Sequence, residues 1–116
     1  MIAQRNYLFI LILLLAGCTA QQERPSVFES LIQAEATIVS LQETLQDALR
    51  LGTVDVSSRE YADVYAGLQR ANLLLDSAWT AYHGGDLQQA DQLREFSVDA
   101  YMAIRPMLYE LAGGTP

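Results

Sequence analysis

The sequence predicts an all-α fold of three long antiparallel helices, arranged up-down-up. Three observations predict it. Apolar residues recur at alternating steps of four and three in three stretches, a capping residue precedes each stretch, and residues 18–116 contain no period-two strand pattern. The connections at 52–56 and 83–86 are short enough to force successive helices to run antiparallel. A chain of 116 residues is long enough for one domain and too short for two ordinary ones.

The first helix is expected to begin at Ser26 and to end at Gly52. Ser26 and Glu29 have the spacing of a capping box, and a glycine is the usual residue just after a helix. At about 25 residues the helix would be ~38 Å long. Its apolar stripe comprises Val27, Leu31, Ala34, Ile38, Leu41, Leu45 and Ala48.

The second helix is expected to begin with a capping box formed by Ser57 and Glu60. Val56 and Tyr61 stand where a hydrophobic staple would place them. Small residues occur on several sides of this helix, as suits a central helix with two close neighbours. Its stripe comprises Tyr61, Val64, Leu68, Ala71, Leu75, Ala78 and Tyr82.

The third helix is expected to begin at Asp86, which caps it together with Gln89. Its stripe comprises Ala90, Leu93, Ser97, Ala100, Ile104, Met107 and Leu111, flanked by Phe96, Tyr101 and Leu108. Pro106 interrupts the pattern, because it cannot donate a hydrogen bond to the carbonyl of Met102. We therefore expect a kink or a fresh helix start there.

The turn between the second and third helices carries the pattern Tyr-x-x-Gly-Asp-Leu-x-x-Ala over residues 82–90. It resembles the turn between the two helices of a tetratricopeptide repeat, although no second copy follows at a 34-residue period. Residues 40–105 resemble short helical proteobacterial lipoproteins of unassigned function. That resemblance implies a helical module of the cell envelope and brings no catalytic residues with it.

The N-terminus has the organisation of a signal peptide. Arg5 precedes an apolar run over residues 8–15, which is too short for a permanent transmembrane helix. Leu15, Ala16, Gly17 and Cys18 follow, and they resemble the lipobox of bacterial lipoproteins. The resemblance implies cleavage before Cys18, and attachment of a diacylglycerol and an N-acyl chain to that residue. The alternative is an ordinary signal peptide, or a short anchor, with an unrelated cysteine.

The lipoprotein interpretation divides the chain into three parts. Residues 1–17 form the signal peptide, 18–25 the acylated cysteine and a polar tether, and 26–116 the three-helix domain. Several acyl chains would hold the protein firmly on a membrane. Thr19 replaces the aspartate that retains such lipoproteins at the inner membrane of enteric bacteria. The resemblance therefore implies the outer membrane, with the domain facing the periplasm.

The composition argues against several kinds of function. Seven arginines against 14 acidic residues give a net charge of −7, which does not suit nucleic-acid binding. A single cysteine forms neither an internal disulfide nor a cysteine metal site. The one histidine, His83, is interpreted as a residue that helps to cap the end of a helix. Without a catalytic motif we expect no enzyme, cofactor or metal, and we interpret Asp91, Glu95 and Asp99 as a solvated face.

Aromatic residues are the remaining candidates for function. Tyr61 and Tyr82 lie on the apolar stripe and are explained by packing. The candidate contacts to a partner or ligand are Tyr65, Trp79, Tyr101 and Tyr109.

We therefore expect a lipid-anchored, non-catalytic binding or scaffold module with a protein partner in the envelope; self-association stays open. The alternative is a carrier or sensor of a small amphiphile held between the helices. A filled seam favours the first, and an apolar cavity with convergent tyrosines favours the second.

Overall fold

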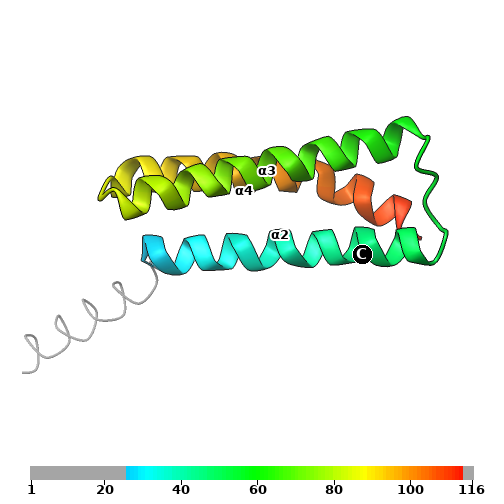
Figure 1. Ribbon diagram of the computed structural model, residues 1–116, viewed down its shortest axis with the longest axis horizontal. Helices are drawn as coiled ribbons and strands as arrows, with labels where there is room; N and C mark the ends of the chain where they lie inside the picture. Colours follow the sequence, from blue (N-terminus) through cyan, green and yellow to red (C-terminus); the bar gives the residue numbers. More distant parts are fainter. Residues whose placement is uncertain (1–25, 114–116) are drawn as a thin grey trace, which may run out of the picture.

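The computed structural model describes residues 26–113 and consists of three antiparallel helices (Figure 1). They are α2 (Val27–Arg50), α3 (Arg59–His83) and α4 (Leu87–Leu111). Within residues 26–113 there is no strand. The predicted all-α, three-helix architecture is thus confirmed. The signal peptide, the lipobox residues, Cys18 and the tether lie outside the described residues, as do residues 114–116.

Two of the three helix starts agree with the sequence prediction. Ser26 Oγ accepts a hydrogen bond from the backbone N–H of Glu29 at 3.2 Å at the start of α2. At the start of α4, Asp86 Oδ1 accepts the N–H of Gln89 at 3.0 Å. Each cap satisfies one of the backbone donors that the first turn of a helix leaves without an intrahelical partner.

The predicted start of α3 at Ser57 was wrong by one residue. Ser58 is the cap, and its Oγ accepts the N–H of Tyr61 at 3.1 Å. The Ser57 side chain lies against the connection instead, where the Ser57 N–H and hydroxyl both donate to Asp55 Oδ1, at 3.0 and 2.6 Å. With the start shifted, Val56 is 62% exposed, so the expected staple with Tyr61 does not bury it.

Glycines with positive φ end α2 and α3, as expected. Gly52 has φ +73° and Gly85 has φ +85°. Beyond each glycine the chain turns back, so that the N–H of Thr53 donates to the Ala48 carbonyl at 3.0 Å and that of Asp86 to the Ala81 carbonyl at 2.9 Å.

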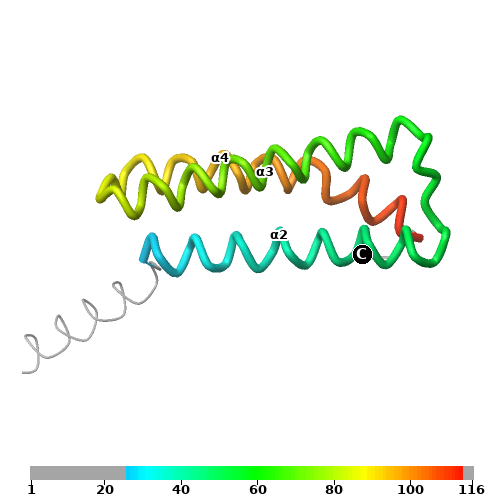
Figure 2. The backbone as a smooth tube through the Cα atoms, viewed as in Figure 1, coloured from blue at the N-terminus to red at the C-terminus, as the bar shows by residue number. Residues whose placement is uncertain are grey.

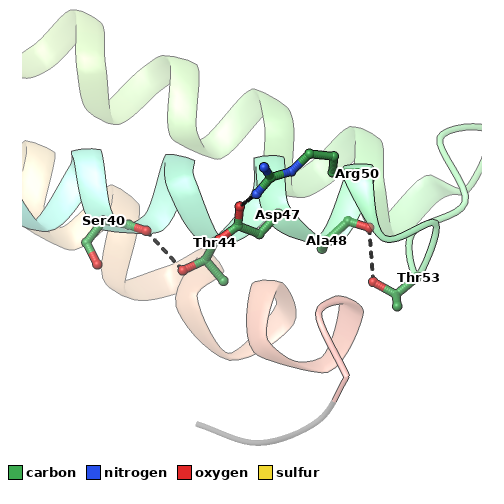
Figure 3. Close-up of polar contacts among 6 residues, drawn as sticks. All are labelled: Ser40, Thr44, Asp47, Ala48, Arg50 and Thr53. Carbon is green, nitrogen blue, oxygen red and sulfur yellow. Dashed lines mark hydrogen bonds and ion pairs between the residues drawn. The ribbon is translucent and has the colours of Figure 1, made fainter.

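The hydroxyl of Thr53 reinforces the end of α2. It donates to the same Ala48 carbonyl at 3.1 Å (Figure 3). One turn earlier Arg50 pairs with Asp47 on the exposed side of the helix. The exposed pair contributes little to stability, so the backbone turn and the Thr53 hydroxyl hold this end.

The most extensive helix contact is that between α3 and α4. Small residues allow it: a Cβ added at Gly67 would overlap Cγ2 of Ile104 on the facing helix. Further along the same interface, the buried hydroxyl of Ser97 donates to the Ala71 carbonyl at 2.7 Å. The contact between α3 and α4 is therefore set by close backbone approach and by one buried hydrogen bond.

Helix α2 packs against both other helices and completes the core. Six of its seven predicted stripe residues are buried: Leu31, Ala34, Ile38, Leu41, Leu45 and Ala48. In α3 the buried residues are the five central members of the predicted stripe, Val64, Leu68, Ala71, Leu75 and Ala78. The heptad spacing thus located the core of both helices.

The path of α4 only partly follows the prediction. The helix continues through Pro106 to Leu111, so no fresh helix starts there. Figure 2 shows its last turns bending away from α3 towards α2. Tyr101 and Leu108, expected to flank the stripe, are buried, whereas Leu93, Ala100 and Met107 are only partly buried.

Candidate functional site

A groove lies between the second half of α2 and the first half of α3; we call it the α2–α3 groove. Its volume is about 440 Å³. The lining residues are Gln42, Leu45, Gln46, Leu49, Tyr61, Tyr65, Leu68, Gln69 and Asn72. All of them are uncharged, although the chain carries a net charge of −7. The α2–α3 groove thus combines leucines with amides and phenols, which donate and accept hydrogen bonds without charge.

Local structure at the connection 51–58 explains why a groove forms at this end. This connection runs from the end of α2 to the start of α3 and is much longer than the turn 84–86 at the other end. Val54 in the connection is buried. Leu45 and Leu68 are buried in the core, and the amide side chains of α2 and α3 lie beside them in the lining of the groove.

Two stacked tyrosines form the aromatic part of the α2–α3 groove. Tyr61 and Tyr65 lie one turn apart on α3, with ring centroids 6.0 Å apart and an interplanar angle of 29°. Tyr65 is 48% exposed, and its hydroxyl accepts a hydrogen bond from Gln69 Nε2 at 3.1 Å. Tyr65 thus combines packing and hydrogen-bond contacts with an exposed surface, as do the tyrosines that are enriched at protein interfaces.

A second aromatic group lies at the opposite end of the bundle, where α2 begins and α3 turns into α4. We call it the aromatic end, and it consists of Phe28, Trp79, Tyr82 and His83. Trp79 has its ring centroid 5.9 Å from those of Phe28, Tyr82 and His83, and it stacks on His83 with an interplanar angle of 22°. Phe28 is 45% exposed and Trp79 is half-buried.

The other two aromatic candidates lie apart from both groups. Tyr101 is 8% exposed and belongs to the hydrophobic core, so it offers no surface to a partner. Tyr109 is half-buried, and the guanidinium of Arg105 lies 5.5 Å from its ring centroid. Arg105 Nε also donates to the Tyr109 hydroxyl at 3.2 Å. The four candidates therefore do not converge on one site.

The larger groove, of about 550 Å³, lies between α3 and α4 and differs in chemistry. It is lined by Gly67, Arg70, Leu74, Phe96, Asp99, Ala100, Ala103 and Ile104. It brings together one positive and one negative side chain with small apolar residues. None of the tyrosines singled out from the sequence lines it.

The acidic residues of α4 do not form a concerted site. Asp91 pairs with Arg94 at 2.9 Å, Glu95 lies 3.8 Å from the same guanidinium, and Asp99 lines the α3–α4 groove. Over residues 26–113, no group of three or more His, Cys, Asp or Glu side chains is placed to hold a metal ion. His83 is exposed at the end of α3.

One carboxylate has an altered pKa, and the cause is local. The Ser57 hydroxyl and the Ser57 backbone N–H both donate to Asp55, and they hold the pKa of this exposed carboxyl below its usual range. Asp55 lies in the connection between α2 and α3 and stabilises the turn there. Nothing in its surroundings suggests proton transfer to a substrate.

The amides of the α2–α3 groove were missed by sequence reasoning. Gln42 and Gln46 on α2, and Gln69 and Asn72 on α3, lie beside the apolar stripes and were not singled out. Polar residues border the apolar stripe of most amphipathic helices, so nothing in the sequence distinguished these four.

Comparison with known proteins adds no relative. No protein-family model, curated protein or solved structure matches the chain. In the part of the chain that the structure describes, none of the helices has the length and apolar character needed to cross a membrane.

Proposed function

We propose that this protein is a lipid-anchored, non-catalytic module of the cell envelope that binds a protein partner through the α2–α3 groove. The acyl chains on Cys18 would hold it on the outer membrane, with residues 26–113 facing the periplasm. The observation that carries the proposal is an open, uncharged groove with a stacked tyrosine pair beside a filled core. No cofactor takes part, and the acidic chain does not bind nucleic acid.

The filled core favours a partner-binding role over a carrier of a small amphiphile. A carrier needs an enclosed apolar cavity between its helices. Here contiguous buried side chains fill the space between the three helices. Tyr65, Tyr101 and Tyr109 lie in three separate places and do not line one cavity. Within residues 26–113 every buried side-chain nitrogen and oxygen has a hydrogen-bond partner. The interior of the described bundle therefore offers no unpaired polar side chain to a ligand.

The amide and phenol groups of the α2–α3 groove suit a peptide segment of a partner. Its main chain would exchange hydrogen bonds with Gln46 and Gln69, while an apolar side chain packs on the leucines and on Tyr65. The turn between α3 and α4 resembles that of tetratricopeptide repeats, which are also binding modules. This resemblance agrees with a binding role.

Photocrosslinking in intact bacteria tests the proposed function. A benzophenone amino acid replaces Tyr65 in the α2–α3 groove or, as the control, Leu73, which is exposed elsewhere on α3. We expect a discrete crosslinked protein from position 65 and not from position 73. No crosslink at position 65, or the same product in equal yield from both positions, would contradict the proposal.

A charge placed in the groove provides a second arm of this test. Gln46 is exposed and lines the groove, so Gln46→Arg should leave the fold intact. It should reduce the crosslink from position 65, because an arginine adds charge and bulk where the lining is neutral. An unchanged yield in a folded variant would show that the partner does not occupy the groove.

A further inference from the structure

We propose that the aromatic end lies against the lipid surface that carries the anchor, so that the bundle stands on the membrane in one orientation. The inference rests on the proposed lipid anchor at Cys18 and adds a second, non-covalent contact to it. Its occupant is the headgroup and upper acyl region of a bilayer. The contact involves the aromatic end together with the exposed Leu87.

Sequence distance places this end near the anchor. Only residues 19–25 separate Cys18 from Ser26, where α2 begins. Even fully extended, they reach roughly 25 Å at ~3.5 Å per residue. Phe28 lies in the first turn of α2 and contacts Trp79 and Tyr82. Figure 1 shows that α2 begins at the end of the bundle where α3 turns into α4. The aromatic end is therefore the part of the folded domain that the tether would hold nearest to the membrane.

The side chains at this end have the chemistry of the membrane interface. Tryptophan and tyrosine join an apolar ring to a polar group, and they gather where headgroups meet hydrocarbon. Phe28 and Leu87 add apolar surface, with 45% and 51% of each residue exposed. The domain needs no covering partner there if lipid covers these side chains.

Charge indicates which kind of lipid contact this is. Glu29 and Asp86 lie at the same end as helix-start acids, the first turns of α2 and α4 contain no arginine, and Arg24 is the one basic residue between Cys18 and α2. The contact is therefore apolar and aromatic and is not driven by attraction to anionic lipid. Its strength should change little when salt is added, unlike that of a basic surface patch.

The orientation has a consequence for the α2–α3 groove. Gln46 lies eighteen residues beyond Phe28 along α2, which is roughly 27 Å at ~1.5 Å per residue. With the aromatic end on the membrane, the α2–α3 groove is held away from the lipid. A partner in the periplasm would then reach it without contacting the bilayer.

Tryptophan fluorescence tests the inference directly, because Trp79 is the only tryptophan in the chain. The acylated protein is reconstituted into phosphatidylcholine vesicles that contain lipid brominated in the upper acyl chain. We expect its emission to shift to shorter wavelength and to fall roughly twofold, as for interfacial tryptophans. In the matched control, Trp79→Phe with Tyr65→Trp, the probe lies in the α2–α3 groove and should not be quenched.

A charge substitution separates lipid contact from simple proximity. Leu87→Glu puts an acid in the first turn of α4, where the helix dipole favours it, so the fold should be retained. It should weaken the quenching of Trp79, because a carboxylate resists burial in lipid. Circular dichroism of the variant confirms that the helices are intact.

The outcomes distinguish this inference from the proposed function. The orientation alone is overturned if the acylated protein floats with the vesicles but Trp79 is not quenched. It is also overturned if the brominated lipid quenches the tryptophans at positions 79 and 65 equally. Quenching that Leu87→Glu does not weaken also overturns it. A protein without acyl groups on Cys18 overturns both, and mass spectrometry detects that case before any vesicle is made.

Discussion

Two adjacent glycines in the turn between α3 and α4 have different roles. Gly85 has φ +85°, a conformation that residues with a side chain rarely adopt. Gly84 has φ −78°, which any residue can adopt. A Cβ on Gly85 would meet no atom within 4 Å, so only the backbone conformation limits substitution there. The local cost of a side chain is therefore conformational and not steric.

Substitutions in this turn should separate in melting temperature. Gly85→Val should destabilise most, because a β-branched side chain strongly disfavours positive φ. Asp86→Ala should cost ~1 kcal/mol through loss of the bond to the Gln89 N–H. Gly84→Ala is the matched control and should be neutral or slightly stabilising. Thermal melts followed by circular dichroism provide the ranking, and equal effects at positions 84 and 85 would contradict it.

His83→Ala at the same turn should leave the melting temperature nearly unchanged. The side chain is exposed, and its contacts are stacking on Trp79 and an edge contact with Tyr82. Crosslinking from position 65 should also persist, because the α2–α3 groove lies at the opposite end of the bundle. A folded His83→Ala protein that no longer crosslinks would place a functional site at this turn.

Asp55 makes one part of the stability depend on pH. Its pKa is lowered by the two hydrogen bonds from Ser57, so the folded state binds this proton less readily than the unfolded state. The stabilisation is present above the usual pKa of 3.8 and is lost as the pH falls through the lowered value. Because the carboxylate is exposed, the effect should be small.

Ser57→Ala tests the cause of this shift. Without the hydroxyl donor, the titration midpoint of Asp55 should move up towards 3.8, as followed by carboxyl chemical shifts in NMR. In addition, the stability difference between wild type and Asp55→Ala should shrink as the pH falls below the lowered pKa. A midpoint that does not move would mean that the hydroxyl of Ser57 does not set this pKa.

At the scale of helices, the contact between α3 and α4 depends on a missing side chain. An alanine normally stabilises a helix interior relative to glycine by roughly 0.5–1 kcal/mol. At Gly67, however, the added Cβ would overlap Ile104 Cγ2, so the helices must separate or repack. Gly67→Ala should therefore destabilise by about 1–3 kcal/mol.

A double-mutant cycle identifies the overlap as the cause. In the presence of Ile104→Ala, which removes both γ carbons, Gly67→Ala should lose its cost and could become stabilising. Urea denaturation of the four proteins measures the coupling. If Gly67→Ala costs the same in both backgrounds, contact with Ile104 does not govern the spacing of α3 and α4.

The sequence predicted the buried faces of α2 and α3 more accurately than that of α4. The stripes of α2 and α3 were located from the sequence because each helix presents one face to the core. The buried residues of α4 also keep steps of four and three, as Ser97, Tyr101, Ile104 and Leu108. The step of four comes first after Ser97, whereas the predicted stripe took the step of three first and so included Ala100 and Met107. Both orders fit the repeat, so the choice between them depends on which side of α4 faces α2 and α3.

The connection and the α2–α3 groove depend on contacts that the sequence does not rank. Ser57 and Ser58 are equally good caps by type. The backbone of the connection places Ser58 Oγ within reach of the Tyr61 N–H, whereas the Ser57 hydroxyl lies on Asp55. Tyr65 was selected from the sequence as an exposed aromatic residue. That it joins amides from a second helix follows only from the spacing of α2 and α3.

For the whole molecule, the two ends of the bundle differ in chemistry. Aromatic residues gather where α2 begins, and the uncharged α2–α3 groove lies towards the other end. A membrane anchor at Cys18 would place the aromatic end towards the membrane and the α2–α3 groove away from it. The proposed attachment of lipid would therefore determine the location of the whole protein.

Cys18→Ser should abolish acylation, because Cys18 is the only thiol in the chain and a thiol receives the diacylglycerol. The apolar run 8–15 is too short to hold the protein as a spanning helix. The variant should therefore leave the detergent phase in a phase-partitioning experiment, whereas wild type stays in it. Gly17→Ala keeps a small residue before the cysteine and should remain acylated, as mass spectrometry of the N-terminal peptide would report.

Since residue 18 lies outside the three-helix bundle, both variants should melt like wild type, so that any loss from the membrane reflects the missing lipid and not unfolding. Equal partitioning of wild type and Cys18→Ser would refute the lipid anchor.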